Sequence, residues 1–394
     1  MTLAKALAQN ATLQELLDMN KNINSNLAAI AIAQGKQASL DYEEILKVVA
    51  AGAGATMFPI GSIFTTVKDI YSYPWAVMHH GTDTDGEPYM RLRVIKAIDN
   101  LQFDNQEAFY YCENGLAAGQ YYITVKSSWG GGCVVNSTWN FTLTQAVPAG
   151  GQLVGFYAMP DRAADYTGHT VASYTSNSSL TPIETVAATA GTAGSSLCIF
   201  AFAGDTTDLN VNSLYRLAYG NGNIGQSAIL QRLNSSGAAG TFWTPQHKFD
   251  RPPSWNSTEA GFMSKLPDGF LDIVHSQTKT IDTNNVFETG DYTTNSSYTI
   301  TGKFLLPTRF EVFGTVERGN YNETQWDFYK NANDKERIMY DNNANARDQC
   351  LASPSVGNAS VVRVVNTTGV LYGGNAFYGY AVAPDCIIRS RTHV

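Results

Sequence analysis

The sequence predicts a β-rich α+β protein whose N-terminus is helical. Three observations lead to this fold class. Apolar residues near the N-terminus recur with a helical period, apolar and polar residues alternate in short runs between about residues 58 and 203, and short helical and strand-like patterns are mixed from about residue 206. A chain of 394 residues has room for two or three domains. The changes of pattern divide it into residues 1–55, 56–205 and 206–394.

The first segment has the pattern of an oligomerising helix. Thr12 and Glu15 have the spacing of a capping box. The positions of the seam that follows are separated by 3, 4, 3, 4 and 3 residues: Leu13, Leu16, Asn20, Ile23, Leu27 and Ile30. This is the spacing of a coiled coil, in which a polar residue such as Asn20 fixes the register. We predict a homotrimer that shares this seam; the alternative is a single amphipathic helix that packs on its own domain.

The end of the first segment predicts a further helix and a linker. The stretch from Ser39 to Val49 carries apolar residues at helical spacing. The alanines and glycines of residues 51–55 follow it and have little side chain to pack, so we expect a linker to the next domain there.

The second segment, residues 56–205, predicts short strands. Apolar residues alternate in the runs 58–67, 120–125, 139–144, 152–157 and 196–202. Glycine- and proline-containing stretches at 130–132 and 148–151 fit turns between them. Short strands joined by such turns are typical of a β-sandwich or jelly-roll-like domain.

The third segment, residues 206–394, mixes helices and strands. Residues 225–234 place Ile229, Leu230 and Leu233 on one helical face, and residues 261–274 predict a second short helix. The β-branched run 360–365 and the closing run 382–388 predict buried strands.

Two stretches of this third segment have the composition of a binding surface. Residues 341–345 are rich in asparagine, and residues 369–380 interleave aromatic residues with glycines. Aromatics set among Gly, Asn and Ser are typical of antibody-like binding loops. The alternative is that they form ordinary hairpins and bulges.

Charge and hydropathy exclude two classes of partner. The net charge is −8 and lysines and arginines form no cluster, which argues against nucleic acid. Residues 13–18 carry charge where a signal peptide must be apolar, and no apolar run approaches the roughly 18 residues that a membrane span needs. We expect no membrane insertion.

No metal, cofactor or catalytic motif is predicted. The five cysteines lack C-x-x-C spacing and are expected to be buried free thiols, with Cys350 and Cys386 the only pair in the third segment close enough to consider for a disulfide. His79 and His80, near Asp83, match no named metal site, and residues 83–86 are more simply a turn. Nucleophile-elbow, P-loop and zinc-protease motifs are absent from the sequence, which predicts that the protein is not an enzyme. A glycosidase is the alternative, since its paired carboxylates meet only in three dimensions.

Motifs over about the last half of the chain resemble one known family. They are Arg216-Leu217-Ala218-Tyr219-Gly220-Asn221, Ser227 to Asn234, Phe242-Trp243-Thr244-Pro245-Gln246, Lys303-Phe304-Leu305-Leu306-Pro307, Glu311-Val312-Phe313-Gly314, Trp326-Asp327-Phe328-Tyr329-Lys330, Arg337-Ile338, Val362-Arg363-Val364-Val365 and Ala383-Pro384-Asp385-Cys386-Ile387-Ile388. Together they resemble the C-terminal domain of many gut-phage virion proteins, a family of C-type-lectin-like domains that includes proteins similar to the major tropism determinant. Where that family has a Trp-Leu-Arg-Ser run, this chain has residues 349–353 without the Trp and Arg. Parts of the second segment, among them Tyr73-Pro74-Trp75, also resemble these proteins.

The resemblance implies a C-type-lectin-like binding domain over residues 206–394 of a virion protein made in the bacterial cytoplasm. Such a protein is a fibre, a tail tip or a head decoration. Its N-terminus would attach it to other virion proteins, and its C-terminal domain would recognise a bacterial or mucosal surface glycan or protein. A purely structural decoration or connector protein that binds other virion subunits is the alternative, and a tail-associated glycosidase is a further one. The third segment lacks the Glu-Pro-Asn or Gln-Pro-Asp motif of calcium-dependent sugar binding.

The resemblance also points to individual ligand-binding residues. In relatives of the tropism determinant a retroelement rewrites Asn-type codons of the lectin-like domain. Residues from the resulting alphabet stand here between strand-like runs: Asp341, Asn342, Asn343, Asn345, Asn358, Ser360, Tyr372, Asn375, Phe377, Tyr378 and Tyr380. We expect them to lie on exposed loops, where their identity has little effect on stability. The alternative is a fixed Asn- and Tyr-rich loop that serves turns and packing.

Overall fold

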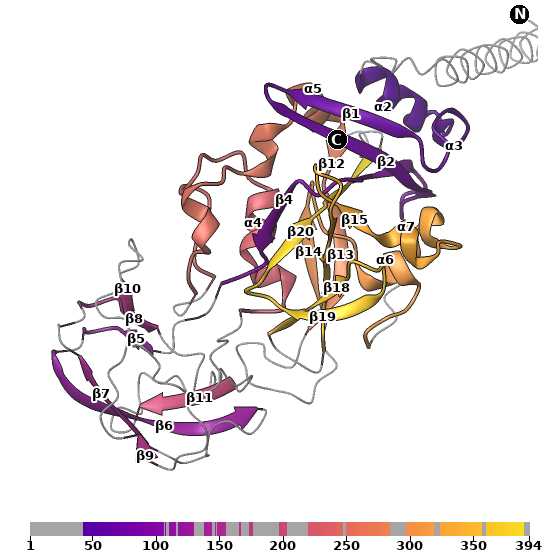
Figure 1. The fold of residues 1–394 in the computed structure, drawn as a ribbon. Coiled ribbons are helices and arrows are strands. Elements are labelled where there is room, and N and C mark those ends of the chain that lie inside the picture. The colour runs from indigo at the N-terminus through magenta and orange to yellow at the C-terminus, as the bar shows by residue number, and fades with distance from the viewer. Residues whose placement is uncertain are drawn as a thin grey trace, which may run out of the picture.

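A computed structural model gives the arrangement of most of the chain (Figure 1). It describes residues 42–105, 107, 110–115, 117–129, 138–143, 146, 148–154, 165–166, 173–175, 197–202, 220–246, 250–283, 297–318, 324–356 and 360–389. This part mixes helices with a larger share of strands, which confirms the coarse fold class. The predicted N-terminal seam and Asn358 lie outside the described residues.

The first sheet joins the beginning of the described chain to its end. It has the order β1 (Ile63–Lys68), β2 (Tyr71–Thr82), β3 (Pro88–Val94), β21 (Asp385–Arg389) and β12 (Val274–His275), and all neighbours are antiparallel. β21, the last described strand, therefore lies between β3 and β12, which both come far earlier in the sequence.

Alternation in β2 and β3 gives this first sheet two different faces. Trp75 and Val77 lie opposite Val94 and Leu92 on a wholly apolar face. Ala76 lies opposite Arg93 on the other face, where polar and aromatic groups meet. The expected turn joins the two strands, with Gly86 at a φ of +83°, a conformation that glycine adopts without strain.

The second sheet consists mainly of strands from the C-terminal third. Its order is β19 (Leu371–Asn375), β18 (Val361–Val365), β17 (Gln349–Pro354), β20 (Gly379–Val382) and β4 (Asp99–Gln102). Only the β17–β20 pair is parallel. The predicted buried strand at 360–365 is confirmed as β18.

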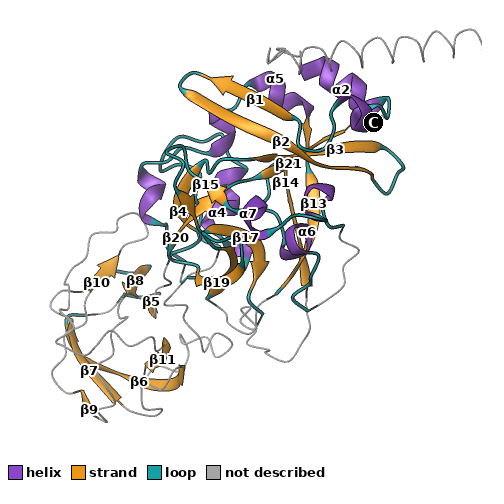
Figure 2. Ribbon diagram, turned by 45° about the vertical axis from the view of Figure 1, so that its right-hand side comes forward, coloured by secondary structure: helices purple, strands orange, loops and turns teal. Residues whose placement is uncertain are grey.

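Short helices and hairpins complete this body (Figure 2). The helices are α2 Tyr42–Ala50, α3 Gly54–Met57, α4 Ala228–Leu233, α5 Asp268–Ile273, α6 Arg309–Phe313 and α7 Asp334–Arg337, with the 3₁₀ turns η1 Ile224–Gln226, η2 Ser254–Ser257, η3 Phe262–Lys265 and η4 Asp327–Tyr329. The hairpins are β13 Gln277–Asp282 with β14 Ser297–Gly302, and β15 Met339–Tyr340 with β16 Ala346–Arg347. The predicted helix at 225–234 is confirmed as α4, which begins where the Ser227 hydroxyl accepts a hydrogen bond from the Leu230 amide.

The main core lies between the two sheets and the helices. Trp75, from the apolar face of the first sheet, has ring contacts with Phe262, Phe270 and Phe304 at centroid distances of 5.2 to 6.4 Å. Helices α2 and α5 contact each other, and α2 also contacts β3 and β21. On the opposite face of the first sheet, Trp326 and Tyr329 pack against Ala76 and its neighbours in a smaller cluster.

The strands of the middle region form two further sheets. β5 (Tyr110–Cys112), β8 (Gly151–Val154) and β10 (Ser173–Thr175) make one, and β6 (Gly119–Trp129), β7 (Thr138–Leu143), β9 (Asp165–Tyr166) and β11 (Leu197–Phe202) make the other. The expected runs at 120–125, 139–144 and 196–202 correspond to β6, β7 and β11. In the described residues these strands pair only with one another.

Three boundaries differ from those predicted by sequence. Residues 56–105 were assigned to the middle domain, but β3 and β4 pair with the C-terminal strands β21 and β20. Residues 51–55 were expected to be a linker, but they lead into α3, where Gly54 is buried against His80. The run 382–388 was expected to be one strand, but β20 ends at Val382 and β21 begins at Asp385 in the other sheet.

Candidate binding surface

Two exposed tyrosines lie on β19 and on its connection to β20. Tyr372 is 63% exposed on β19, which is an edge strand of the second sheet, and Tyr378 is 50% exposed just before β20. The partly buried Phe377 pairs with Tyr378, with ring centroids 4.4 Å apart. We call Tyr372, Phe377 and Tyr378 the aromatic surface.

A buried tyrosine stabilises the backbone that carries this surface. Tyr380 is only 5% exposed, and its hydroxyl donates to the Asn375 carbonyl oxygen at 2.8 Å. Its ring lies over Gly374, where an added Cβ would approach the hydroxyl to 2.1 Å. Only glycine therefore fits at position 374 without movement. Burial raises the pKa of the Tyr380 phenol, and the neighbouring Cys350 thiol, Asp348 carboxyl, and Tyr378 and Tyr372 phenols add to this shift.

Backbone hydrogen bonds fix the connection between β19 and β20. The buried Ala376 donates its N–H to the Ser360 carbonyl oxygen at 2.8 Å and accepts from the Asp104 N–H at 3.0 Å. Gln102 of β4 donates from Nε2 to the Phe377 carbonyl oxygen at 2.8 Å. The aromatic surface is thus held by strands from both ends of the described chain, which limits its conformational freedom.

The Asn-rich turn of residues 341–345 is a separate exposed group. Asp341 Oδ1 accepts from the backbone N–H groups of Asn343 and Asn345 at 2.9 Å, and its Oδ2 accepts from Arg347 Nε at 2.9 Å. These hydrogen bonds, first of all the one from Asn345, lower the pKa of Asp341 to about 2. The side chains of Asn342, Asn343 and Asn345 are exposed.

The expected ligand-binding residues therefore divide into two kinds. Tyr372, Phe377, Tyr378, Asn342, Asn343 and Asn345 present at least part of their side chains to solvent, and Asn375 is partly buried. Tyr380 and Ser360 were expected on exposed loops, but both are buried: Tyr380 lies on β20 inside the second sheet, and Ser360 lies just before β18, where its carbonyl oxygen accepts from the buried Ala376 N–H. Asp341 is a structural residue, since both of its carboxylate oxygens hold the turn.

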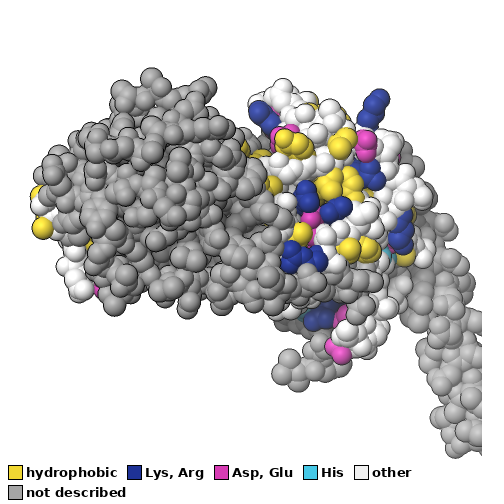
Figure 3. Space-filling view, turned by 90° about the horizontal axis from the view of Figure 1, so that it is seen from below, with side chains coloured by type: hydrophobic (Ala, Val, Ile, Leu, Met, Phe, Trp, Pro, Cys, Tyr) yellow, Lys and Arg dark blue, Asp and Glu magenta, His cyan; other side chains and the backbone are white. Residues whose placement is uncertain are grey.

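The described part of the lower face of the molecule in Figure 1 has mixed polarity. Figure 3 views the molecule from the lower side of Figure 1, where β18 and β19 lie. On the described part of this face hydrophobic side chains gather in small groups between basic and acidic ones. Small apolar groups among polar ones are ordinary on a protein surface and do not by themselves mark a binding site.

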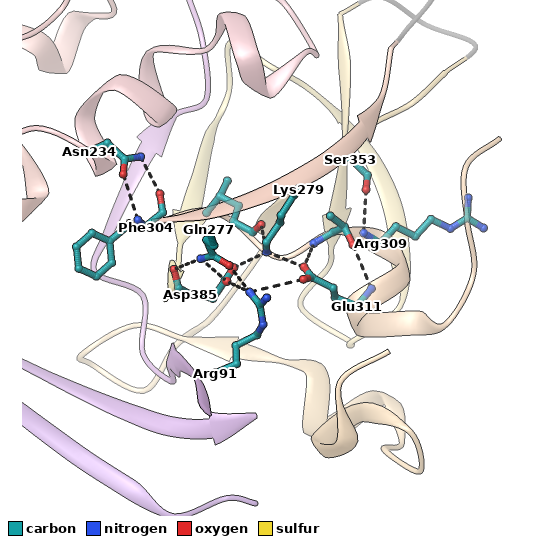
Figure 4. A network of polar contacts seen from close by, with 11 residues as sticks. Arg91, Asn234, Gln277, Lys279, Phe304, Arg309, Glu311, Ser353 and Asp385 are labelled. Carbon is teal, nitrogen blue, oxygen red and sulfur yellow. Dashed lines mark hydrogen bonds and ion pairs between the residues drawn. The ribbon is translucent and has the colours of Figure 1, made fainter. Parts of the chain in front are cut away.

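A buried polar network lies on the polar face of the first sheet (Figure 4). Lys279 of β13 donates from Nζ to Asp385 Oδ2 and Glu311 Oε2, both at 2.7 Å. Arg91 of β3 donates to Asp385 Oδ1 and to Gln277 Oε1, each at 2.5 Å. The network joins β3, β13, α6 and β21, so its role is to hold together elements that are distant in sequence.

The electrostatics of this network favour the charged form of Asp385. Burial by itself raises the pKa of Asp385, but the Lys279 ammonium and the Arg91 guanidinium outweigh burial and hold it below its usual value. Both cations also lie 5.4 Å from the Trp326 ring centre, a cation–π geometry. Only one feature of the sequence indicates this network: Asp385 is a single charge inside the otherwise apolar run 382–388. No sequence pattern predicts its partners.

The histidines and cysteines have structural contacts. His79 Nδ1 lies 2.8 Å from Asp327 Oδ2, and His80 Nε2 lies 2.8 Å from the Phe58 carbonyl oxygen. Among the described residues no group of three potential metal-binding side chains comes together. Cys112, Cys350 and Cys386 are buried free thiols, so Cys350 and Cys386 form no disulfide. In the same described part, no helix has the length and apolar character to cross a membrane.

Comparison with family models, with curated proteins and with solved structures gives no match to this chain.

Proposed function

We propose that this chain is a bacteriophage virion protein that recognises a component of a bacterial or mucosal surface, by contact and without chemistry. The observation that supports this most is the exposed pair Tyr372 and Tyr378 on a frame that Gly374 and Tyr380 make rigid. Rigid aromatic side chains supply much contact area at low entropic cost and dominate the energy of many binding surfaces. The resemblance of the C-terminal motifs to C-type-lectin-like phage domains supplies the virion setting.

The ligand in this proposal is a surface glycan or protein. Aromatic faces stack on the apolar side of a sugar ring or on apolar side chains, and their edges carry hydroxyl groups. The exposed amides of Asn342, Asn343 and Asn345 offer donors and acceptors for sugar hydroxyls or backbone groups. The proposal includes no cofactor. It also includes a homotrimer formed through residues 1–55, which attaches to other virion proteins.

The proposal is tested with the double variant Y372S/Y378S in the full chain. Loss of two tyrosine hot spots costs about 2 kcal/mol or more each, about 4 kcal/mol together, so binding to host cells should weaken by on the order of a thousandfold. The melting temperature should stay nearly unchanged, because both side chains are exposed. Binding of labelled protein to host cells and thermal unfolding are measured in parallel.

Two controls sharpen this experiment. The variant Y372F/Y378F keeps the rings and should retain most of the binding if stacking dominates. Asp85 is also exposed, but in the turn between β2 and β3 of the other sheet, so D85S should bind like the natural protein. Undiminished binding by Y372S/Y378S contradicts the proposed surface.

A structural decoration or connector protein is the second candidate. It predicts that Y372S/Y378S leaves adsorption of assembled particles unchanged but reduces incorporation of the protein into particles. The pairing of the buried carboxylates Asp385 and Glu311 with Lys279 supports a non-catalytic role over the glycosidase alternative, because these groups stabilise the fold.

A further inference from the structure

The edge strand β1 carries an exposed aliphatic face. Ile63 and Val67 are 57% and 60% exposed, and Ile70, in the turn to β2, is 88% exposed. Ile60, just before the strand, is exposed as well. We call these four residues the β1 patch. β1 pairs with β2 on one side only, and the structure describes no strand on its other side.

The strand's own alternation explains why these residues point outward. Phe64 and Thr66 pair with Trp75 and Tyr73 and face the apolar core. Ile63 pairs with Ala76, so Ile63 and Val67 belong to the opposite face of the sheet. Edge strands commonly carry charged or polar residues on such a face, whereas this one carries Thr65 between two exposed aliphatic residues.

That opposite face is covered elsewhere along the same sheet. Around Ala76 and Met78 it packs against Trp326 and Tyr329, at and beside η4. The cover does not extend to β1, where Ile63 and Val67 remain exposed. The β1 patch is therefore the solvent-exposed part of a sheet face that is buried around Ala76 and Met78.

Proteins protect edge strands of this kind with charges, prolines or a covering element. The charged residues of this strand and its turn, Lys68 and Asp69, lie at one end of the strand, and Lys68 forms an ion pair with Asp268 of α5 at 3.4 Å. Four aliphatic side chains beside an open edge are a site for association. A specific partner is thus expected to cover the patch.

The position of the N-terminal segment identifies that partner as a second copy of this chain. Forty-one residues precede α2 and carry the seam spacing that predicts association of copies. They enter the body at α2, which contacts β3 and β21 of the sheet to which β1 belongs. Figures 1 and 2 show α2 and β1 at the same end of the body. Copies joined through the seam would meet next at this end.

We propose that the β1 patch is a contact between copies of this chain, separate from the N-terminal seam and continuous with it. The choice of a second copy rests on the oligomer included in the proposed function. The patch would keep the bodies of neighbouring copies together below the seam, and the face that carries Tyr372 and Tyr378 would stay free for a ligand.

The test is the variant I63K/V67K in the full chain, studied by sedimentation equilibrium. Lysine at both positions places charge in the contact, so the dissociation constant of the oligomer should rise at least about tenfold, which corresponds to about 1.4 kcal/mol. A second variant, I70K, changes the most exposed of the four residues and should weaken association without any effect on folding. The matched control is V370K, an exposed valine before β19 in the other sheet, which should associate like the natural protein.

A monomeric natural protein overturns the proposal, and so does an unchanged dissociation constant in both I63K/V67K and I70K. Circular dichroism establishes that each variant is folded. Binding to host cells is measured separately with Y372S/Y378S, which should associate normally. If I63K/V67K loses association but keeps ligand binding per chain, the β1 patch is tested independently of the ligand-binding surface. If Y372S/Y378S loses ligand binding but associates normally, the proposed function is tested independently of the β1 patch.

Discussion

At the scale of single residues, Asp341 shows how one carboxylate fixes an exposed turn. Its oxygens accept four hydrogen bonds from within the hairpin, two of them from backbone N–H groups. The folded-state pKa of about 2 is below the ordinary value of 3.8. Stability from this group is therefore present above the unfolded-state pKa and is lost as the pH falls from about 4 to about 2.

We predict that the amide NMR signals of Asn343 and Asn345 titrate with a midpoint near pH 2, because their N–H groups donate to Asp341. The variant D341N should remove this titration and make both amides exchange faster with solvent at neutral pH, since a neutral amide oxygen accepts more weakly. D85N changes an aspartate in another exposed turn and serves as the control. A midpoint near pH 4 would contradict the hydrogen-bonded arrangement.

Residue type alone does not separate the surface tyrosines from the core tyrosine. Tyr372, Tyr378 and Tyr380 stand within nine residues among glycines, and composition groups them as one binding loop. Strand pairing and the missing Cβ of Gly374 turn Tyr380 inward and leave the other two exposed. Which tyrosine is buried therefore depends on the contact between β19 and β20, and no local sequence pattern predicts that contact.

At the scale of elements, the network around Lys279 determines how firmly the C-terminal strand β21 is held. Asp385 accepts hydrogen bonds from Lys279, Arg91 and Gln277, and its side chain is fully buried. We predict that D385N destabilises the protein by about 3–5 kcal/mol, because it leaves Glu311 as the one carboxylate that the network offers to both Lys279 and Arg91. Urea unfolding at pH 7 measures the change.

The matched control for this experiment is the exposed ion pair of Asp268 with Lys68. Its N–O distance is 3.4 Å and the Asp268 side chain is 91% exposed. D268N removes the same charge from a solvated pair and should change stability by less than about 1 kcal/mol. Equal changes in the free energy of unfolding for D385N and D268N would show that burial of the network does not increase its contribution to stability.

Element types were largely predictable, whereas their partners were not. The period-two runs correctly predicted β6, β7 and β11, the β-branched run 360–365 predicted β18, and the spacing of Ile229 and Leu233 predicted α4. The prediction of a single strand over residues 382–388 was wrong, because the two halves of this run pair with β4 and with β3, which lie far away in sequence. Periodicity reports which face a residue occupies and carries no information on which strand lies beside it.

At the scale of the whole molecule, the described chain leaves its main body and returns to it at one place. Asp104 and Asn221 are 117 positions apart, yet the Asn221 N–H donates to Asp104 Oδ2 at 3.0 Å. Phe103 and Ile224, on either side of this point, both belong to the main core. The sequence-based boundary at residue 56 missed this arrangement, because strands of similar pattern occur on both sides of residue 105.

We predict that residues 107–219 are an insertion whose removal leaves the body folded. A linker of a few glycines and serines is long enough to join Asn105 to Gly220, because Asp104 and Asn221 are in hydrogen-bonding contact. The described middle strands pair with one another and with no strand of the body. The shortened protein should therefore unfold cooperatively, with a melting temperature close to that of the full chain. Because the aromatic surface lies on β19 and its connection to β20, the shortened protein should also keep ligand binding that depends on Tyr372 and Tyr378.

As a control, I224D in the shortened protein places a charge in the main core and should abolish cooperative unfolding. Non-cooperative unfolding of the shortened protein without that substitution would show that the middle strands are required for the fold of the body.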